Sequence, residues 1–160
     1  MPRVLIFGAG HVGRALARAL APLPVAARLI DSRAEQLALV DCPDKCLSAL
    51  PGSEVRSAPP GTAYVIATHD HALDFLLVGE ALRRSDAAYV GMIGSSTKRA
   101  KFYAWARRSE PRVDPEGLVC PIGQAGLGDK RPEVIAAFVA TELLSVFATQ
   151  SIPERMENPA

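Results

Sequence analysis

The sequence predicts a doubly wound α/β fold, in which a mostly parallel sheet carries helices on both faces. Three observations support this prediction. Short apolar runs of the kind found in strands buried on both faces recur along the chain. Segments with helical spacing separate them, so that strand and helix alternate throughout. The first apolar run also ends in a glycine-rich turn that leads directly into a helix.

That turn follows the apolar run 4–7 and has the pattern G-x-G-x-x-G. The helical spacing behind it places Arg14 and Arg18 on the polar face of the predicted helix. Strand, turn and helix in this order are typical of a dinucleotide-binding site, where N–H groups at the helix start hold a phosphate. The predicted cofactor contacts here are Gly8, Gly10, His11, Val12 and Gly13. A turn that serves only packing is the alternative.

The second strand, 25–30, ends at Asp31, about twenty residues after the turn. An acid at this place can accept a hydrogen bond from a ribose hydroxyl, so Asp31 and the adjacent Ser32 are predicted contacts. Asp31 favours NAD over NADP, although Arg33 keeps NADP open. A short helix is expected over 32–37, and a strand pair over 45–49 and 55–57.

The later elements are predicted from apolar runs and helical periodicity. They are strand 63–67, helix 73–84, strand 87–93, helix 97–108, strand 118–120 and a long helix 132–149. We expect one domain over 1–150 and a polar tail over 151–160. The long helix is apolar almost all round, which predicts burial on more than one side and hence a homodimer.

A polar cluster, Thr68, His69, Asp70 and His71, follows the strand 63–67. Thr68 or Asp70 can cap the next helix, whose first turn contains Asp74. His-x-His can also ligate a metal, but no third ligand is identifiable and no metal site is predicted. We predict that all four residues of the cluster combine capping with hydrogen bonds to a ligand.

Another cluster, Gly94, Ser95, Ser96 and Lys98, lies where the strand 87–93 ends. Lys98, Arg99 and Lys101 occupy the first two turns of the following helix, and no acidic residue occurs from 87 to 109. Because a helix start disfavours cations, a bound anion held by Lys98 with Ser95 or Ser96 would resolve the conflict. A solvated basic face is the alternative.

Cys120 follows the last predicted strand and is either a small buried apolar residue or a functional thiolate.

The whole chain has 160 residues, of which 49% are hydrophobic, and a net charge of +1. These values indicate one ordinary globular domain and do not indicate nucleic-acid binding. We expect no membrane partner and a cytoplasmic location, because no export signal precedes the first strand. No base with an orienting partner is evident, so catalysis is not expected.

Four motifs, 7–13, 68–74, 89–99 and 120–123, together resemble the Rossmann domain of the XdhC/CoxI family, the xanthine dehydrogenase accessory proteins. The resemblance covers about Val4 to Leu144 and implies a Rossmann-like fold. It implies a chaperone that binds molybdenum cofactor, as molybdopterin or its dinucleotide form, and delivers it to a molybdenum hydroxylase apo-enzyme of the xanthine dehydrogenase type. A sulfurase is a further candidate partner, and Cys120 is included among the cofactor contacts. An NAD(P)-dependent oxidoreductase or redox sensor is the alternative function, and an interaction module without a ligand is a weaker third.

Overall fold

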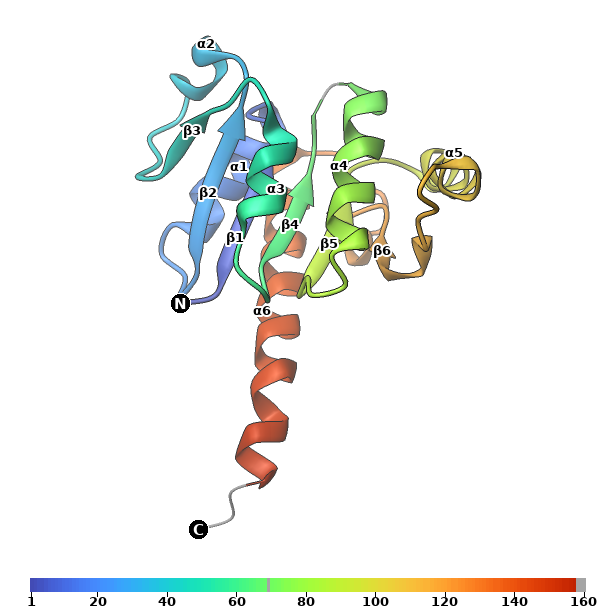
Figure 1. Cartoon of the computed structure of the whole chain (residues 1–160). Helices are drawn as coiled ribbons and strands as arrows, with labels where there is room; N and C mark the ends of the chain where they lie inside the picture. The colour runs from blue at the N-terminus through green and yellow to red at the C-terminus, as the bar shows by residue number, and fades with distance from the viewer. Residues whose placement is uncertain (69, 158–160) are drawn as a thin grey trace.

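The structure is a computed structural model, and it describes residues 1–68 and 70–157, without the side chains of Ala125 and of residues 151–157. Its centre is a six-stranded parallel sheet with the strand order β3-β2-β1-β4-β5-β6 (Figure 1). The strands are β1 Arg3–Phe7, β2 Ala26–Asp31, β3 Lys45–Leu47, β4 Ala63–Ile66, β5 Tyr89–Met92 and β6 Leu118–Val119. This order reverses between β1 and β4, which is the switch point where doubly wound sheets bind ligands. The predicted fold class is therefore confirmed.

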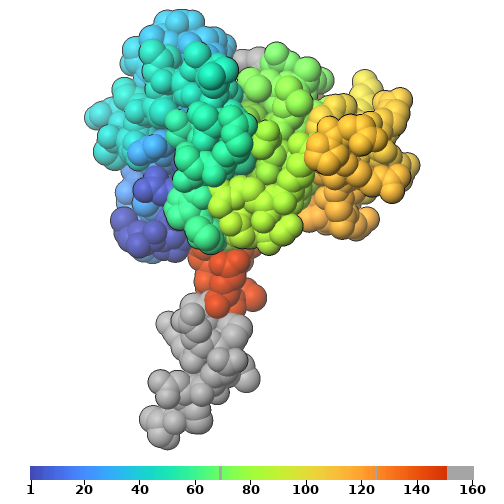
Figure 2. All heavy atoms as spheres, viewed as in Figure 1, coloured from blue at the N-terminus to red at the C-terminus, as the bar shows by residue number. Residues whose placement is uncertain are grey.

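Successive residues of the central strands point to opposite faces of the sheet and build two cores. Val4 and Ile6 of β1 belong to one core, while Leu5 and Phe7 belong to the other. The first core is completed by α1 (His11–Leu20) and α6 (Pro132–Glu157). The second is completed by α3 (Pro51–Ser57), α4 (His71–Arg83) and α5 (Ser96–Arg108). Figure 2 shows α3 and α4 covering the second face, with α5 at the far end of the sheet.

Three short helical segments complete the chain, namely α2 (Ala34–Leu37), η1 (Pro115–Gly117) and η2 (Gln124–Gly126). The prediction of a strand at 55–57 is wrong, because these residues end α3. Pro51 starts this helix at a position where its missing N–H is no loss, and Glu54 and Arg56 suit the two ends of the helix dipole. Accordingly, β3 pairs in parallel with β2 rather than with residues 55–57.

Phe102 of α5 is buried and packs between α4 and α5. The centroid of its ring lies 5.4 Å from the ring centroid of Phe75 of α4 and 5.6 Å from that of Trp105. Gly79 of α4 permits the contact, since a Cβ there would lie 3.0 Å from the Trp105 ring. This aromatic cluster fixes α5 against α4 and so determines where the α5 N-terminus lies.

The last helix, α6, packs on α1 through Ala136, Val139 and Leu143 and then projects beyond the sheet (Figure 1). It continues to Glu157 instead of ending near Thr149. In the described part of the chain, the stretch Pro132–Gln150 alone has the length and mean hydropathy (1.5) of a membrane span. Length and composition are weak grounds for a span in a helix that packs on the core. Dimerisation through α6 stays a prediction.

Candidate functional site

A cavity of about 380 Å³ opens at the carboxyl ends of β1, β2 and β4, next to the switch point. Its walls come from the ends of three strands and from the starts of α3 and α4. The lining residues are Phe7, Gly8, Ile30, Asp31, Ser32, Arg33, Ala49, Pro51, Thr68, Asp70 and Leu73. Five of the predicted contacts are among them: Gly8, Asp31, Ser32, Thr68 and Asp70. The volume lies within the range of small-molecule sites, and the apolar part of the lining suits one flat ring.

The glycine turn has two positions where a side chain cannot fit. Gly8 has φ +110°, and a Cβ on it would lie 2.1 Å from the carbonyl oxygen of Ala67. A Cβ on Gly13 would lie 1.7 Å from the carbonyl oxygen of Gly8. The first strand therefore lies directly against the end of β4, and α1 lies directly against the turn. Gly8 and Gly13 serve the packing that brings this edge of the sheet together, as the packing interpretation of the turn requires.

The backbone of Ala9, inside the turn, is held at both its N–H and its carbonyl group. Its N–H donates to Asp31 Oδ2 at 2.7 Å, and its carbonyl accepts from Arg14 Nη1, also at 2.7 Å. Arg14 Nη1 also donates to Gln36 Oε1 at 3.0 Å. Of the two arginines predicted on the polar face of this helix, Arg14 is buried and Arg18 is exposed. Helical periodicity alone could not show that α2 covers this side of α1.

Asp31 accepts four hydrogen bonds from the chain itself, more than expected for an acid that is free to bind a ribose. Oδ1 accepts from Arg33 N and Nε, while Oδ2 accepts from Ala9 N and Arg33 Nη2. A carboxylate has about four acceptor positions, so donors of the chain itself fill them all. Burial raises the pKa of Asp31, but the bonds from Arg33 and Ala9 outweigh burial and bring this pKa below its ordinary value of 3.8. Two of the four bonds come from the Arg33 guanidinium, whose side chain is 38% exposed.

The N-terminus of α1 is left without a side-chain cap. Gly10 occupies the N-cap position, no side chain accepts a bond from the first turn, and no acidic residue lies in that turn. N–H groups at an uncapped helix start attract an anion. His11 is exposed beside this end, with Nδ1 3.4 Å from Arg14 Nη2. Gly10, His11, Val12 and Gly13 do not line the cavity, but they adjoin it through Gly8.

On the opposite wall, Asp70 is the N-cap of α4, and Oδ1 accepts from Leu73 N at 3.1 Å. The predicted capping role is therefore confirmed. The N–H of Thr68 donates to Asp74 Oδ1 at 3.1 Å, and its hydroxyl donates to the same oxygen at 2.5 Å. His71 is exposed at the first position of α4, outside the cavity lining. The predicted contact His69 lies outside the described residues.

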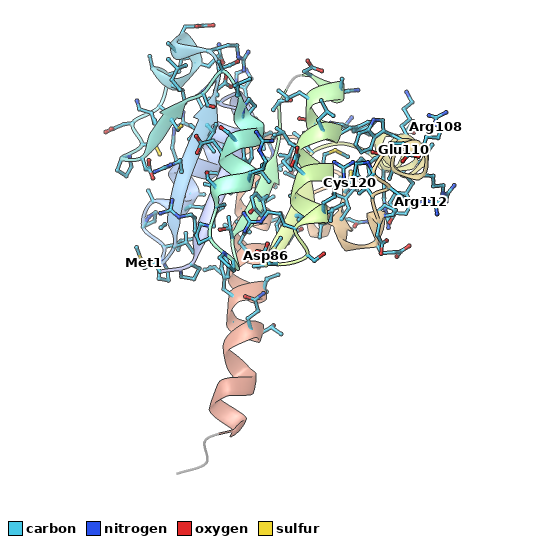
Figure 3. The ribbon with its side chains drawn as sticks, viewed as in Figure 1. Met1, Asp86, Arg108, Glu110, Arg112 and Cys120 are labelled. Carbon is cyan, nitrogen blue, oxygen red and sulfur yellow. The ribbon has the colours of Figure 1, made fainter. Side chains whose placement is uncertain are left out.

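Lys98 is buried, and its charge is paired within the protein. Nζ lies 2.7 Å from Asp74 Oδ2, and the two side chains are 8% and 0% exposed. The carboxylate of Asp74 thus supplies the negative charge beside Lys98. The other cations of α5 are exposed, and Arg108 and Arg112 point away from the body (Figure 3). Ser95 caps α5 by accepting from Lys98 N at 3.2 Å, while Ser96 is exposed.

Cys120 lies in the half of the molecule that carries α4 and α5 (Figure 3). It is buried, and its thiol lies 3.9 Å from the carbonyl oxygen of Ser95. Burial raises the pKa of this thiol against the opposing effect of Lys98 and Arg99, which favours the neutral form. Gly94, Ser95, Ser96, Lys98 and Cys120 all lie outside the cavity lining. The predicted contacts therefore lie along one edge of the sheet, but only the glycine turn, the end of β2 and the 68–71 cluster reach the cavity.

The charges indicate what the cavity can bind. The charged groups in the lining are the carboxylates of Asp31 and Asp70 and the guanidinium of Arg33. Because negative charge exceeds positive charge, the cavity suits a neutral ring with hydroxyl or amino groups better than a phosphate. A phosphate fits the adjoining α1 N-terminus instead.

Among residues 1–68 and 70–157, no group of three His, Cys, Asp or Glu side chains is placed to hold a metal ion. Sequence reasoning missed the far wall of Ala49, Pro51 and Leu73; the proline at the start of a helix was the available signal.

The strand order and the glycine turn define a domain of the Rossmann type. Residues 4–143 match the family described as the XdhC Rossmann domain. The chain therefore belongs to this family, and the predicted resemblance is confirmed.

One solved structure with the same fold is that of a xanthine dehydrogenase from Bacillus halodurans, so described, with 22% sequence identity and a TM-score of 0.77. The match covers 92% of this chain but 43% of that one, so the present chain spans less than half of its length. At this identity the similarity concerns the fold alone. A search of curated proteins gave no match.

Proposed function

We propose that the chain is an accessory protein that holds a pterin-based molybdenum cofactor and delivers it to a molybdenum hydroxylase of the xanthine dehydrogenase type. Membership of the XdhC family supports the class of function. The observation that carries the proposal is the cavity at the switch point beside the uncapped start of α1. A ring and an anionic group can be held there side by side.

In this proposal the ring of the cofactor, or the base of its dinucleotide form, occupies the cavity against Phe7, Ile30 and Leu73. Its phosphate lies on the N–H groups of Gly10, His11 and Val12. Asp70 and Thr68 bind hydroxyl or amino groups at the opposite wall. The bound group supplies redox chemistry in the recipient enzyme, while the residues of this chain bind and orient it.

The test is the cofactor content of the protein purified from cells that make molybdenum cofactor. We expect molybdenum, and a fluorescent pterin after oxidation, in a constant ratio to the chain. Gly10→Val should remove most of both, because the extended backbone of Gly10 (φ −78°, ψ −166°) accepts a side chain, which would stand over the phosphate position. Ala137→Val, at an exposed position of α6, is the control and should retain both.

Wild-type protein without molybdenum and pterin would contradict the proposal. Tight binding of NADH by such protein would favour the NAD(P)-dependent alternative. Delivery is tested by adding loaded protein to a cofactor-free molybdenum hydroxylase, whose activity should appear in proportion to the molybdenum transferred.

A further inference from the structure

The ion pair between Lys98 and Asp74 connects two parts of the sheet edge that lie far apart in the sequence. Lys98 stands in the first turn of α5, and Asp74 stands in the first turn of α4. Nζ and Oδ2 are 2.7 Å apart, and both side chains are buried. The cavity reaches the start of α4 at Asp70 and Leu73, and neither Lys98 nor Asp74 lines it.

Asp74 transmits this contact to the cavity wall. Its second oxygen, Oδ1, accepts from both the N–H and the hydroxyl of Thr68, which lines the cavity. The hydroxyl oxygen of Thr68 in turn accepts from Asp70 N at 3.2 Å. The peptide next to Thr68 is also the one that Gly8 approaches, since a Cβ on Gly8 would lie 3.0 Å from Thr68 N. A displacement of Thr68 would therefore affect both Asp70 and the glycine turn.

Gly94 gives Lys98 its path to Asp74. A Cβ on Gly94 would lie 2.6 Å from Lys98 Cδ and 3.1 Å from Lys98 Cβ, so the aliphatic stem of Lys98 runs across the bare glycine. A carboxylate that is fully buried requires a compensating charge. Lys98 supplies that charge at 2.7 Å from one oxygen of Asp74, while the other oxygen holds Thr68.

We propose that Lys98 is a positioning residue for the cavity: through Asp74 it fixes Thr68 and Asp70 in the geometry that receives the ligand. The identity of that ligand rests on the proposed function, but the positioning itself does not. Lys98 therefore controls the cavity from outside it, by neutralising Asp74 rather than by touching the ligand.

The test uses ligand-free protein and measures amide hydrogen exchange by NMR at Thr68, Asp70 and Leu73. In Lys98→Met, exchange at these amides should become at least about tenfold faster, because their acceptors are no longer held. Amides of β1 and β2 should remain protected. Arg99→Met removes the neighbouring exposed cation of the same helix and should leave all of these rates unchanged.

The double variant Lys98→Met with Asp74→Asn separates positioning from a loss of folding. The carboxamide oxygen that Asp74→Asn leaves in place can still accept from Thr68 and needs no counter-charge, so exchange at Thr68 should return towards the wild-type rate. Unchanged exchange in Lys98→Met, an equal rise throughout β1 and β2, or no recovery in the double variant would each overturn the proposal. Because no ligand is present, these results do not depend on whether the protein binds molybdenum cofactor.

Discussion

The two halves of the sheet edge differ in how far their ion pairs are exposed to solvent. At the end of β2, Asp31 is paired with Arg33, whose side chain is 38% exposed beside a cavity. Between α4 and α5, Asp74 is paired with Lys98, and the two side chains are 0% and 8% exposed, with neither lining the cavity. An exposed partner can leave at little cost, while a buried partner cannot. The comparison indicates that the β2 half can rearrange at little cost, and that the α4–α5 half provides a fixed support.

The largest effect is expected in the fixed half. Lys98→Met should lower the free energy of unfolding by about 3–5 kcal/mol, because it leaves Asp74 buried without a partner. Urea denaturation measures this, and the double variant with Asp74→Asn should recover part of the loss. A loss below about 1 kcal/mol would place Lys98 with ordinary surface pairs and remove the contrast.

The glycine turn should come next. Gly8→Ala combines a backbone conformation unsuited to alanine with a contact 2.1 Å from the Ala67 carbonyl, so a loss of about 2–4 kcal/mol is expected. Gly61→Ala is the matched control, because Gly61 also has a positive φ (+81°) but nothing lies within 4 Å of its Cβ position. The excess of the first loss over the second, measured by thermal or urea unfolding, is the cost of the close approach. Equal losses would mean that β1 and β4 can move apart.

Asp31→Ala should cost about 1.5–3 kcal/mol at neutral pH, the scale of hydrogen bonds to a charged group. The pKa of Asp31 is lowered in the folded protein, so its contribution is complete above the ordinary value of 3.8 and is lost as pH falls through the lower folded value. Unfolding of both proteins by urea at several pH values between neutral and acidic should show the difference shrinking only at the acidic end. A difference that does not depend on pH would assign the effect to packing instead of charge.

The smallest effect on stability is expected for Arg33→Met, under about 1 kcal/mol, because the pair is partly exposed. Its effect on binding should be opposite in sign. Nε and Nη2 of Arg33 occupy the acceptor positions on Asp31 that the two hydroxyls of a ribose would use. Removing the guanidinium should therefore raise the affinity for ADP-ribose, measured by calorimetry, with Arg18→Met as the exposed control. Reduced affinity would instead identify Arg33 as a ligand contact.

The sequence was sufficient for the fold because buried parallel strands are continuous apolar runs, and these are visible without any knowledge of their neighbours. It was sufficient for part of the site, since Gly8, Asp31 and Thr68 follow such runs directly. The pairing of Asp74 with Lys98 could not be predicted, because it depends on the packing of α4 against α5 across 24 residues of sequence. The same holds for Arg14, whose burial depends on Gln36, and for Arg33, for which the sequence offers both an acid and a ligand phosphate as partners.

The projecting half of α6 bears on how the protein can be handled. In Figure 1 the strands run towards the edge that carries the cavity, while β1 begins and α6 ends on the opposite side. A tag, a fluorophore or a surface linker attached beyond either of these elements would stand clear of the cavity mouth. Immobilisation through α6 would therefore present the cavity to solution in a uniform orientation, which suits surface-based measurement of the proposed cofactor transfer.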